Sequence, residues 1–420
     1  MHFPAQNKPV LQRITVSDLR LGMYIHKLEG NWFLHPFWRD SFLLEREQDL
    51  KKIQDSPIHT LWIDLSKSSD PAQPASPGMA RSGDTAPAAA QAPALPASHE
   101  TPGQSAAVAL HEEIEKARRI CLDAREQIMD MFEEARMGRA IDPESTIPLV
   151  QQIAESVNRH PQALFSVARL KTKDTYTYLH SVAVCALMLA LARQLRLAPD
   201  LTRQAGLGGL MHDLGKAGIP PEILNKPGRL TDQEFDVMRQ HPQIGMDLLQ
   251  KSGASAEVMG IALHHHEKIN GTGYPGKLAG ASIPLLARMG AVCDVYDAVT
   301  STRIYKAAWN PAEALHQMAS WAGHFDRPIF EAFVKTVGIY PIGSLVRLRS
   351  QRLAVVVDQE GDLLLTPKVI VFYDAKTKRE IPPTVLKLSA PDCGEAILGQ
   401  ESSARWGFEH LDQYWMPAPG

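Results

Sequence analysis

One short stretch of this chain, His212-Asp213-Leu214-Gly215-Lys216, constrains both its fold and its chemistry. An adjacent histidine and aspartate offer two metal-binding atoms from neighbouring residues, and the lysine three positions on places a positive charge beside them. A metal next to a fixed cation is suited to binding and cleaving a phosphate. The pair would mean little alone, but it belongs to an ordered series of histidines and aspartates at helical positions, which the fold has to bring together.

Seven residues of this series are candidate metal ligands: His180, His212, Asp213, His241, His265, His266 and Asp294. Imidazole nitrogens and carboxylate oxygens together suit iron, manganese, nickel or zinc, and nothing suggests a thiolate site. The set exceeds what one tetrahedral ion needs, and Asp213 can give one oxygen to each of two ions. The sequence therefore predicts two divalent transition-metal ions, about 3.5–4 Å apart.

Each candidate also has a plain structural reading. A lone histidine near a helix, such as His180 or His241, is more often hydrogen-bonded or on the surface than a ligand. Asp294 could be a buried polar group of a helix, and Asp213 could be a helix cap. The order of all seven along the chain favours ligation. His264 directly precedes the histidine pair, and we expect it to point elsewhere.

The composition excludes several function classes. Of the 420 residues, 44% are hydrophobic and 22% charged, and the net charge of −3 gives no general attraction to nucleic acid or to an acidic membrane. The four cysteines are widely spaced, as in reduced cytoplasmic proteins. The first residues lack the apolar core of a signal peptide, and the longest uncharged apolar run, Val182 to Ala192, is too short to span a bilayer. We expect a cytoplasmic protein that binds neither DNA, RNA nor membrane.

An Ala/Pro-rich segment, residues 67–105, separates two parts of the chain. It has no aromatic residue and almost no large aliphatic one, so we predict a disordered linker that acts as a plain tether. The linker divides a small accessory domain at 10–66 from a helical domain at 106–342. A small β appendage follows at 343–415.

The accessory domain is predicted to combine short strands with one helix. The strands are expected at Ile14–Leu19, Gly22–Ile25 and Thr60–Asp64, and the helix at Glu45–Ile53. Aromatic residues crowd one stretch: Trp32, Phe33, Phe37, Trp38 and Phe42. These side chains form either the core of this small domain or an exposed binding surface.

The helical domain is predicted to open with a long helix at 106–137. Apolar or small residues repeat along it at alternating spacings of four and three: Leu110, Ile114, Ala117, Cys121, Ala124, Ile128 and Met131. This stripe either packs on its own domain or forms a homodimer.

Further helices are expected at Val182–Leu197, at Ala256–His266, at Ile283–Ser301 and from the capping box Thr231–Glu234 to Leu249. Strands are expected at Leu345–Arg349, Leu353–Val357 and Val369–Tyr373, with a hairpin turn at Asp358–Asp362. The fold class is therefore mainly α, with small β-containing units at both ends of the chain.

Residues from about 165 to 340 resemble the HD-GYP family, a branch of the helical HD metal phosphohydrolases. The matching text is Tyr176–Ser181, HDLGK at 212–216, His241–Gly245, HHEKINGTGYP at 265–275, Cys293–Ala298 and Ser301–Lys306. The first 66 residues resemble the small domain that often precedes such modules. The resemblance implies hydrolysis of the bacterial messenger cyclic di-GMP, to linear pGpG or on to GMP.

The resemblance also implies roles for single residues. The seven candidates above match the family's metal ligands, with Asp213 as the bridging carboxylate. Lys216 matches a lysine that contacts the scissile phosphate, and Arg303 and Lys306 match residues that hold the substrate's phosphates. Tyr274, within the Gly273-Tyr274-Pro275 loop, either stacks near a base or shapes the loop. That loop is also a candidate docking surface for the GGDEF-domain cyclases that make the substrate.

Three positions depart from the family's pattern. Tyr176 stands where some members carry a glutamate that binds a third metal, so we predict two ions, with iron, manganese or nickel the best candidates. Asn270 replaces the usual aspartate but can still cap a turn and accept a hydrogen bond. Ile304 replaces the usual proline after Arg303, which would loosen that loop.

Three functions remain open at this point. The first is a metal-dependent cyclic di-GMP phosphodiesterase. The second is a catalytically weak receptor or scaffold that binds cyclic di-GMP or docks a cyclase, although a pure scaffold has no need for every ligand. The third is a phosphohydrolase of another signalling nucleotide, such as a mixed cyclic dinucleotide or guanosine tetraphosphate.

Overall fold

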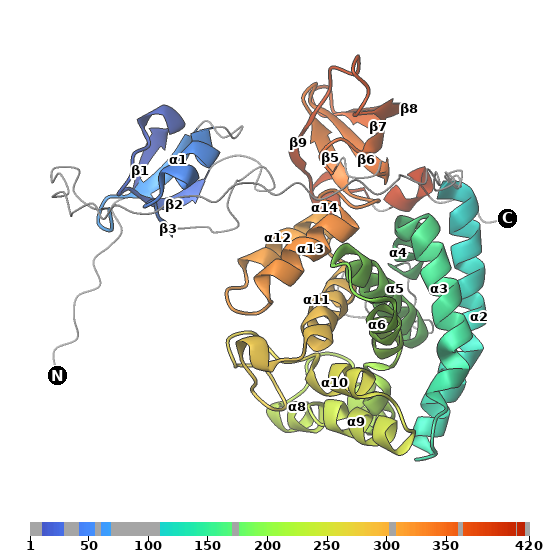
Figure 1. The fold of residues 1–420 in the computed structure, drawn as a ribbon. Coiled ribbons are helices and arrows are strands. Elements are labelled where there is room, and N and C mark those ends of the chain that lie inside the picture. The colour runs from blue at the N-terminus through green and yellow to red at the C-terminus, as the bar shows by residue number, and fades with distance from the viewer. Residues whose placement is uncertain are drawn as a thin grey trace, which may run out of the picture. The chain divides into compact units, whose positions relative to one another are not determined.

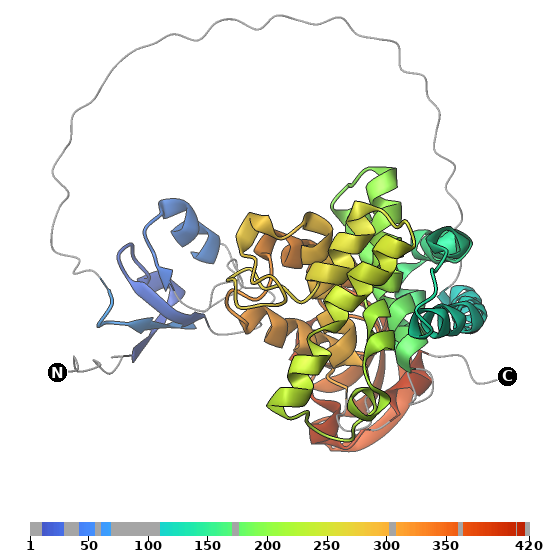
Figure 2. The same cartoon turned by 90° about the horizontal axis from the view of Figure 1, so that it is seen from below.

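The computed structural model describes residues 11–28, 42–54, 60–68, 110–169, 176–301, 308–359, 364–408 and 410–415. It divides into two compact units, Met1–Ala107 and Val108–Gly420 (Figures 1 and 2). The segment predicted as a linker, 67–105, lies outside the described residues apart from its first two positions. In the part of the chain that is described, no helix combines the length and the apolar character needed to cross a membrane.

The first unit is an antiparallel sheet with one helix. Its strands are β1 (Leu11–Thr15), β2 (Tyr24–Leu28), β3 (Phe42–Leu43) and β4 (Thr60–Asp64), in the order β1-β4-β2-β3, and its helix is α1 (Glu47–Gln54). The first strand starts and ends earlier than predicted. The chain turns into the 3₁₀ helix η1 (Val16–Asp18), which buries Val16.

Aliphatic side chains form the core of this unit: Val16, Leu19, Ile25, Leu44, Ile53, Leu61 and Ile63. Among the aromatic residues that were considered for this core, Trp32, Phe33, Phe37 and Trp38 lie outside the described residues.

The second unit is mainly helical, as predicted. Its longer helices are α2 (Leu110–Arg136), α3 (Ile147–Arg159), α4 (Pro161–Arg169), α5 (Tyr176–Gln194), α6 (Pro199–Met211), α8 (Asp232–Met238), α9 (His241–Lys251), α10 (Ala256–His264), α11 (Leu285–Thr300), α12 (Pro311–Ser320) and α13 (Arg327–Val337). Short helical turns are η3 (Pro143–Thr146), η4 (Leu214–Gly218), α7 (Pro221–Leu224), η5 (Gly280–Ser282), α14 (Ser403–Trp406) and η6 (Leu411–Tyr414).

Helix α5 forms the centre of this unit, and α2, α3, α4, α6, α11 and α13 pack around it. Every residue from Val182 to Ala192 is buried, as expected for a segment that is apolar on all sides. Gly209 lets α6 approach closely, because a Cβ there would lie 3.0 Å from the backbone of Cys185. The end of α6 is thereby held against α5.

Helix α2 lies at the outer edge of this unit beside α3 (Figures 1 and 2). The residues of its predicted stripe from Ile114 to Met131 are at most 5% exposed and belong to the main hydrophobic core. The stripe therefore packs on its own domain. These six residues are therefore not available as a homodimer seam, and a homodimer through another part of the helix stays a prediction.

One predicted helix is two helices. The segment expected to run from the capping box to Leu249 breaks between α8 and α9. In a continuous helix the carbonyl of Met238 would bond the amide of residue 242, but Pro242 has no amide hydrogen and occupies the first turn of α9 instead. His241 thus becomes the first residue of a new helix.

An antiparallel sheet ends the second unit. Its strands are β5 (Leu345–Leu348), β6 (Arg352–Asp358), β7 (Lys368–Asp374), β8 (Arg379–Lys387) and β9 (Ile397–Gln400), in the order β8-β7-β6-β5-β9. The first three were predicted, and much of the expected turn at 358–362 lies outside the described residues. Figure 1 shows the sheet near α13, at the opposite end of the unit from α8 and α9.

The pair Glu113–Arg159 ties α2 to α3 and provides a test of this packing. The Glu113 carboxylate is fully buried and accepts two hydrogen bonds from Arg159, of 2.8 and 2.9 Å. We predict that Glu113→Gln lowers the free energy of unfolding by about 1.5–3 kcal/mol, measured by urea denaturation. The control is Glu134→Gln. Glu134 is also on α2, but its ion pair with Arg139 is exposed, so this change should lower the free energy of unfolding by about 0.5 kcal/mol or less.

The same pair predicts a pH dependence. Burial opposes ionisation of Glu113, but the hydrogen bonds and charge of Arg159 outweigh it and hold the pKa of the carboxyl below its ordinary 4.5. The stabilisation is therefore present above that value and is lost as the pH falls through the lower, folded-state pKa. The difference between wild type and Glu113→Gln should shrink in acid, and a constant difference would contradict the assignment.

Candidate metal centre

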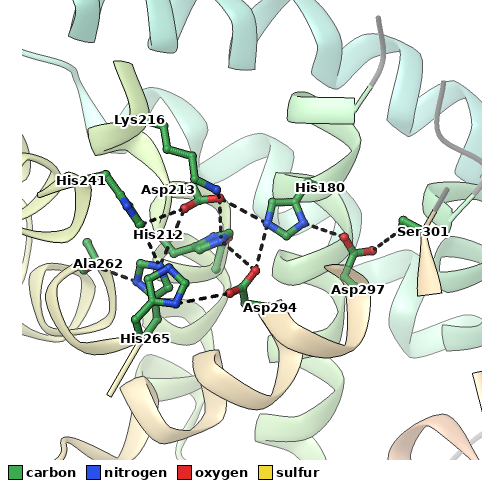
Figure 3. Close-up of polar contacts among 12 residues, drawn as sticks. His180, His212, Asp213, Lys216, His241, Ala262, His265, Asp294, Asp297 and Ser301 are labelled. Atoms are coloured by element: carbon green, nitrogen blue, oxygen red, sulfur yellow. Dashed lines mark hydrogen bonds and ion pairs between the residues drawn. The ribbon is translucent and has the colours of Figure 1, made fainter. Parts of the chain in front are cut away.

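The fold brings all seven predicted ligands together (Figure 3). His180 comes from α5, His212 and Asp213 from the junction of α6 and η4, His241 from the start of α9, His265 and His266 from just after α10, and Asp294 from α11. Their ligand atoms form three overlapping groups, each with all its atoms within 4.8 Å of one another. All seven side chains are buried except His266, which is 23% exposed.

Asp213 lies between two sets of histidines. Its Oδ2 is 3.3 Å from Nε2 of both His180 and His212. Its Oδ1 is 3.4 Å from Nε2 of His241 and 3.8 Å from Nε2 of His265. The two oxygens of one carboxylate therefore face different ligand sets, and the side chain makes no helix-capping hydrogen bond that would explain its position.

Asp294 closes the other side of the centre. Its Oδ1 is 3.2 Å from Nε2 of His180 and 3.8 Å from that of His212, and its Oδ2 is 4.0 Å from Nδ1 of His266. This carboxylate also faces histidines from both sets. A plain role as a buried helix polar group does not account for that convergence.

Helix ends orient three of the imidazoles. Nδ1 of His212, which follows α6, lies 2.9 Å from the carbonyl of Gly209, and Nδ1 of His265, which follows α10, lies 3.0 Å from that of Ala262. Nδ1 of His241 lies 2.8 Å from the Met238 carbonyl at the end of α8. Carbonyls in the last turn of a helix lack an intrahelical partner and accept these bonds. In the neutral ring Nδ1 is then the donor, which leaves the lone pair on Nε2, the nitrogen that faces the centre.

His180 is oriented by a carboxylate instead. Its Nδ1 lies 2.6 Å from Oδ2 of Asp297, and Ser301 Oγ lies 3.4 Å from the other oxygen (Figure 3). Asp297 stands one helical turn after Asp294 on α11, so both aspartates present their carboxylates to the same face. Asp297 was not among the predicted site residues, although its spacing from Asp294 was a usable signal.

Glycine at position 215 allows the turn η4, which follows Asp213, to approach helix α9, which begins at His241. A Cβ there would lie 1.9 Å from the carbonyl of His241 and 2.4 Å from the amide nitrogen of Gly245. The turn η4 therefore lies directly on the backbone of α9. This contact fixes Asp213 relative to His241, and it explains why the HDLGK stretch carries glycine in its fourth position.

The pKa shifts divide the histidines into the same two sets as the two oxygens of Asp213. Burial lowers the pKa of His241 to about 4 and that of His266 to about 3, and it lowers the pKa of His265 well below its usual range. Burial acts in the same direction on His212, but the Asp213 and Asp294 carboxylates outweigh it and raise the pKa to about 10. The hydrogen-bonded carboxylates likewise raise the pKa of His180.

This donor set fits a metal. Within the described part of the chain, His212 Nε2 and Asp213 Oδ1 are buried atoms without a hydrogen-bond partner, and both point into the cluster. A buried polar atom left in this way costs free energy unless something else satisfies it. The two carboxylates draw positive charge into the cluster, and neutral imidazoles supply lone pairs. Divalent transition metals take this combination of nitrogen and oxygen donors.

A loop after α10 forms the rim of the centre. Glu267 is buried and accepts hydrogen bonds from the amides of Gly276, at 2.6 Å, and Leu278, at 3.1 Å. Asn270 Oδ1 accepts from the amide of Thr272 at 3.1 Å, so the expectation that asparagine still caps this turn is confirmed. Within this loop Tyr274 stacks on His266, with ring centroids 4.8 Å apart.

The other predicted site residues differ in their placement. Nζ of Lys216 is hydrogen-bonded to Oδ2 of Asp213, and its side chain is 30% exposed. His264 lies outside the ligand groups, with Nδ1 3.8 Å from Glu267, as expected. Arg303 and Lys306 lie outside the described residues, as does Ile304.

Comparisons with known proteins agree with this geometry. A family model described as "Domain of unknown function (DUF3391)" matches residues 11–146, and one described as "HD domain" matches residues 147–329. The chain is 51% identical over 408 residues to "Cyclic di-GMP phosphodiesterase PA4108" of Pseudomonas aeruginosa, which covers 97% of this chain and 96% of that protein.

Two further relatives match parts of the chain. Identity to the cyclic di-GMP phosphodiesterase response regulator RpfG of Xanthomonas campestris pv. campestris is 38% over 199 residues, or 45% of this chain and 52% of that protein. Identity to "3'3'-cGAMP-specific phosphodiesterase 1" of Vibrio cholerae is 34% over 165 residues, or 39% and 38%. The chain belongs to the HD domain family, of the HD-GYP type, with a DUF3391 domain before its HD domain.

The contact between Asp297 and His180 predicts a loss of metal affinity on mutation. An asparagine that turns its amide NH₂ toward Nδ1 favours the tautomer with hydrogen on Nε2, the nitrogen that faces Asp213 and Asp294. We expect Asp297→Asn to lower the affinity for Mn²⁺ about 10- to 100-fold, measured by competition with a fluorescent chelator. Asp200→Asn, at a carboxylate that is 87% exposed, is the control. Equal affinity in both variants would contradict the orienting role.

Proposed function

We propose that this protein is a metal-dependent phosphodiesterase that hydrolyses cyclic di-GMP. The observation that carries the proposal is the position of Asp213, whose two oxygens face separate sets of buried histidines. A carboxylate shared in this way is typical of two-metal phosphoesterase sites. The near full-length similarity to a cyclic di-GMP phosphodiesterase supplies the substrate.

Two ions would share the seven ligands. His180, His212 and Asp213 form one group of donors, and Asp213 with His241, His265 and His266 forms another. Asp294 faces both sets. Iron, manganese and nickel are the proposed metals because each accepts mixed imidazole and carboxylate ligands in an open geometry.

The chain's own residues bind and orient the substrate. Bound metal ions supply a hydroxide nucleophile at neutral pH and stabilise charge on a phosphoryl oxygen. Lys216 stands beside Asp213 and is partly exposed, so its ammonium group can donate to a phosphoryl oxygen as charge develops there. Buried walls on the side of α5 and α6 exclude bulk water, which strengthens these interactions.

We further propose that Arg303 and Lys306 hold the second phosphate, where a guanidinium can bind two oxygens at once. Tyr274 belongs to the substrate side of the centre, because it is half-buried and covers His266. The Gly273-Tyr274-Pro275 loop is proposed as a docking surface for GGDEF-domain cyclases. The unit at 10–66 is proposed as an accessory domain of the phosphodiesterase domain at 106–342.

A mixed cyclic dinucleotide is the second candidate substrate. It rests on the 34% identity to a 3'3'-cGAMP-specific phosphodiesterase, which covers 39% of this chain. The lower identity and shorter match rank it below cyclic di-GMP. A catalytically weak receptor is disfavoured by the complete ligand set.

The test is turnover of cyclic di-GMP by the manganese- or iron-loaded protein, with pGpG and GMP resolved by chromatography. We expect Asp213→Ala to lower kcat at least about 1,000-fold, because it removes a ligand from both subsites. 3'3'-cGAMP and cyclic di-AMP are measured in parallel. Tight binding of cyclic di-GMP without turnover would leave the receptor, and faster turnover of 3'3'-cGAMP would move the assignment to the second candidate.

A further inference from the structure

Two side chains outside the ligand set extend the rim of the metal centre. Phe235 lies on α8 and Arg239 is the residue that caps its C-terminal end, one helical turn later. The Arg239 guanidinium carbon is 4.5 Å from the Phe235 ring centroid. Both also meet the loop after α10. Arg239 lies 5.9 Å from the Tyr274 ring, and Phe235 meets that ring edge-on at 6.4 Å.

Tyr274 connects this pair to the metal ligands. Its ring stacks on His266 with an angle of 25° between the planes. Phe235, Arg239, Tyr274 and His266 therefore form a continuous row of planar groups that begins at a ligand and ends in solvent. We call the first three residues the α8 platform.

The platform is open to a ligand. Phe235 is 39% exposed, and the Arg239 side chain is 49% exposed. Arg239 also pairs with Asp236 at 3.1 Å, but that carboxylate is itself 69% exposed. Single exposed aromatic residues are common and need no explanation. This one is unusual because a guanidinium covers it beside a ring that lies on a metal ligand.

Helix α8 does not need these side chains in order to fold. A capping box between Thr231 and Glu234 starts the helix, and Lys226 binds the Glu234 carboxylate. The exposed faces of Phe235 and Arg239 contribute little to a core. A structural role alone therefore leaves their placement at the rim of the centre unexplained.

We propose that the α8 platform binds a guanine base of the cyclic dinucleotide while the metal centre holds its phosphate. This inference rests on the proposed function and names the residues that recognise the base. Aromatic rings and guanidinium planes stack on nucleobases. The fork of Arg239 can donate to both O6 and N7 of guanine, whereas adenine offers a donor, N6, in place of O6.

Charge and shape together decide the preference for guanine. Lysine at position 239 would keep the charge but lose the planar, two-pronged donor. Alanine at position 235 would keep the helix but remove the stacking surface. The platform therefore predicts that Arg239→Lys weakens the preference for guanine over adenine, and that Phe235→Ala weakens binding of both bases.

The experiment uses the full chain and measures two quantities. The first is binding of fluorescent cyclic di-GMP to manganese-loaded protein, followed by stopped flow before turnover. The second is KM and kcat with manganese for cyclic di-GMP, cyclic di-AMP and bis(p-nitrophenyl) phosphate, a phosphodiester without a base. The control is Arg203→Ala, because Arg203 is equally exposed at 49% and forms the same 3.1 Å pair with Asp200.

We expect Phe235→Ala and Arg239→Ala to weaken cyclic di-GMP binding and raise its KM about tenfold. The KM of these two variants for bis(p-nitrophenyl) phosphate should stay near the wild-type value. Arg203→Ala should match wild type on every substrate. Arg239→Lys should lower the ratio of kcat/KM for cyclic di-GMP over cyclic di-AMP about tenfold.

An equal rise in KM for cyclic di-GMP and for bis(p-nitrophenyl) phosphate would overturn the platform and leave α8 a structural support. Unchanged KM for cyclic di-GMP would overturn it as well. Wild-type protein that binds cyclic di-GMP without cleaving it would refute the proposed phosphodiesterase function, while the binding affinities of the variants would still decide the platform. Wild-type protein that neither binds nor cleaves it would refute both.

Discussion

The structure depends on burying two carboxylates and five imidazoles at one point. Such a cluster is unfavourable unless each polar atom finds a partner, because water is excluded from it. The structure satisfies the outer ring nitrogens with carbonyls and one carboxylate, and leaves the inner nitrogens and oxygens facing one another. The arrangement is consistent with a site whose remaining partners are cations.

Helix ends provide most of this arrangement. His212, His241 and His265 each lie at a helix terminus and bond a carbonyl that has no partner within its helix. The break at Pro242 illustrates the mechanism, because the proline leaves the Met238 carbonyl free and the His241 ring bonds it. One local break in the helix thus places a candidate ligand and orients its ring.

The sequence predicted which side chains cluster better than it predicted their surroundings. Residue type and order along the chain were enough to select the seven candidate ligands that the fold brings together, since the HDLGK and HHE stretches confine the donors to a few helical positions. The break between α8 and α9 was missed because the capping box predicted one helix toward Leu249, and the meaning of Pro242 depends on the His241 contact.

Other features depend on tertiary packing, which the sequence pattern does not show. The stripe on α2 has the spacing of a dimer seam, but the same spacing also suits packing on a single domain. Strands β8 and β9 were not predicted. In β8 most side chains are exposed, so it lacks the apolar alternation that marks a strand. The spacing of Asp297 from Asp294 placed both on one face of α11, but its contact with His180 depends on how α11 packs against α5.

The central claim is that Asp213 separates and joins two metal subsites. Anomalous diffraction from manganese-loaded crystals, at the manganese absorption edge, tests it most directly. The account predicts two peaks per chain on opposite sides of the Asp213 carboxylate, about 3.5–4 Å apart. One peak should lie beside His180 and His212, and the other beside His241, His265 and His266. A single peak, or two peaks that do not share Asp213, would contradict the account.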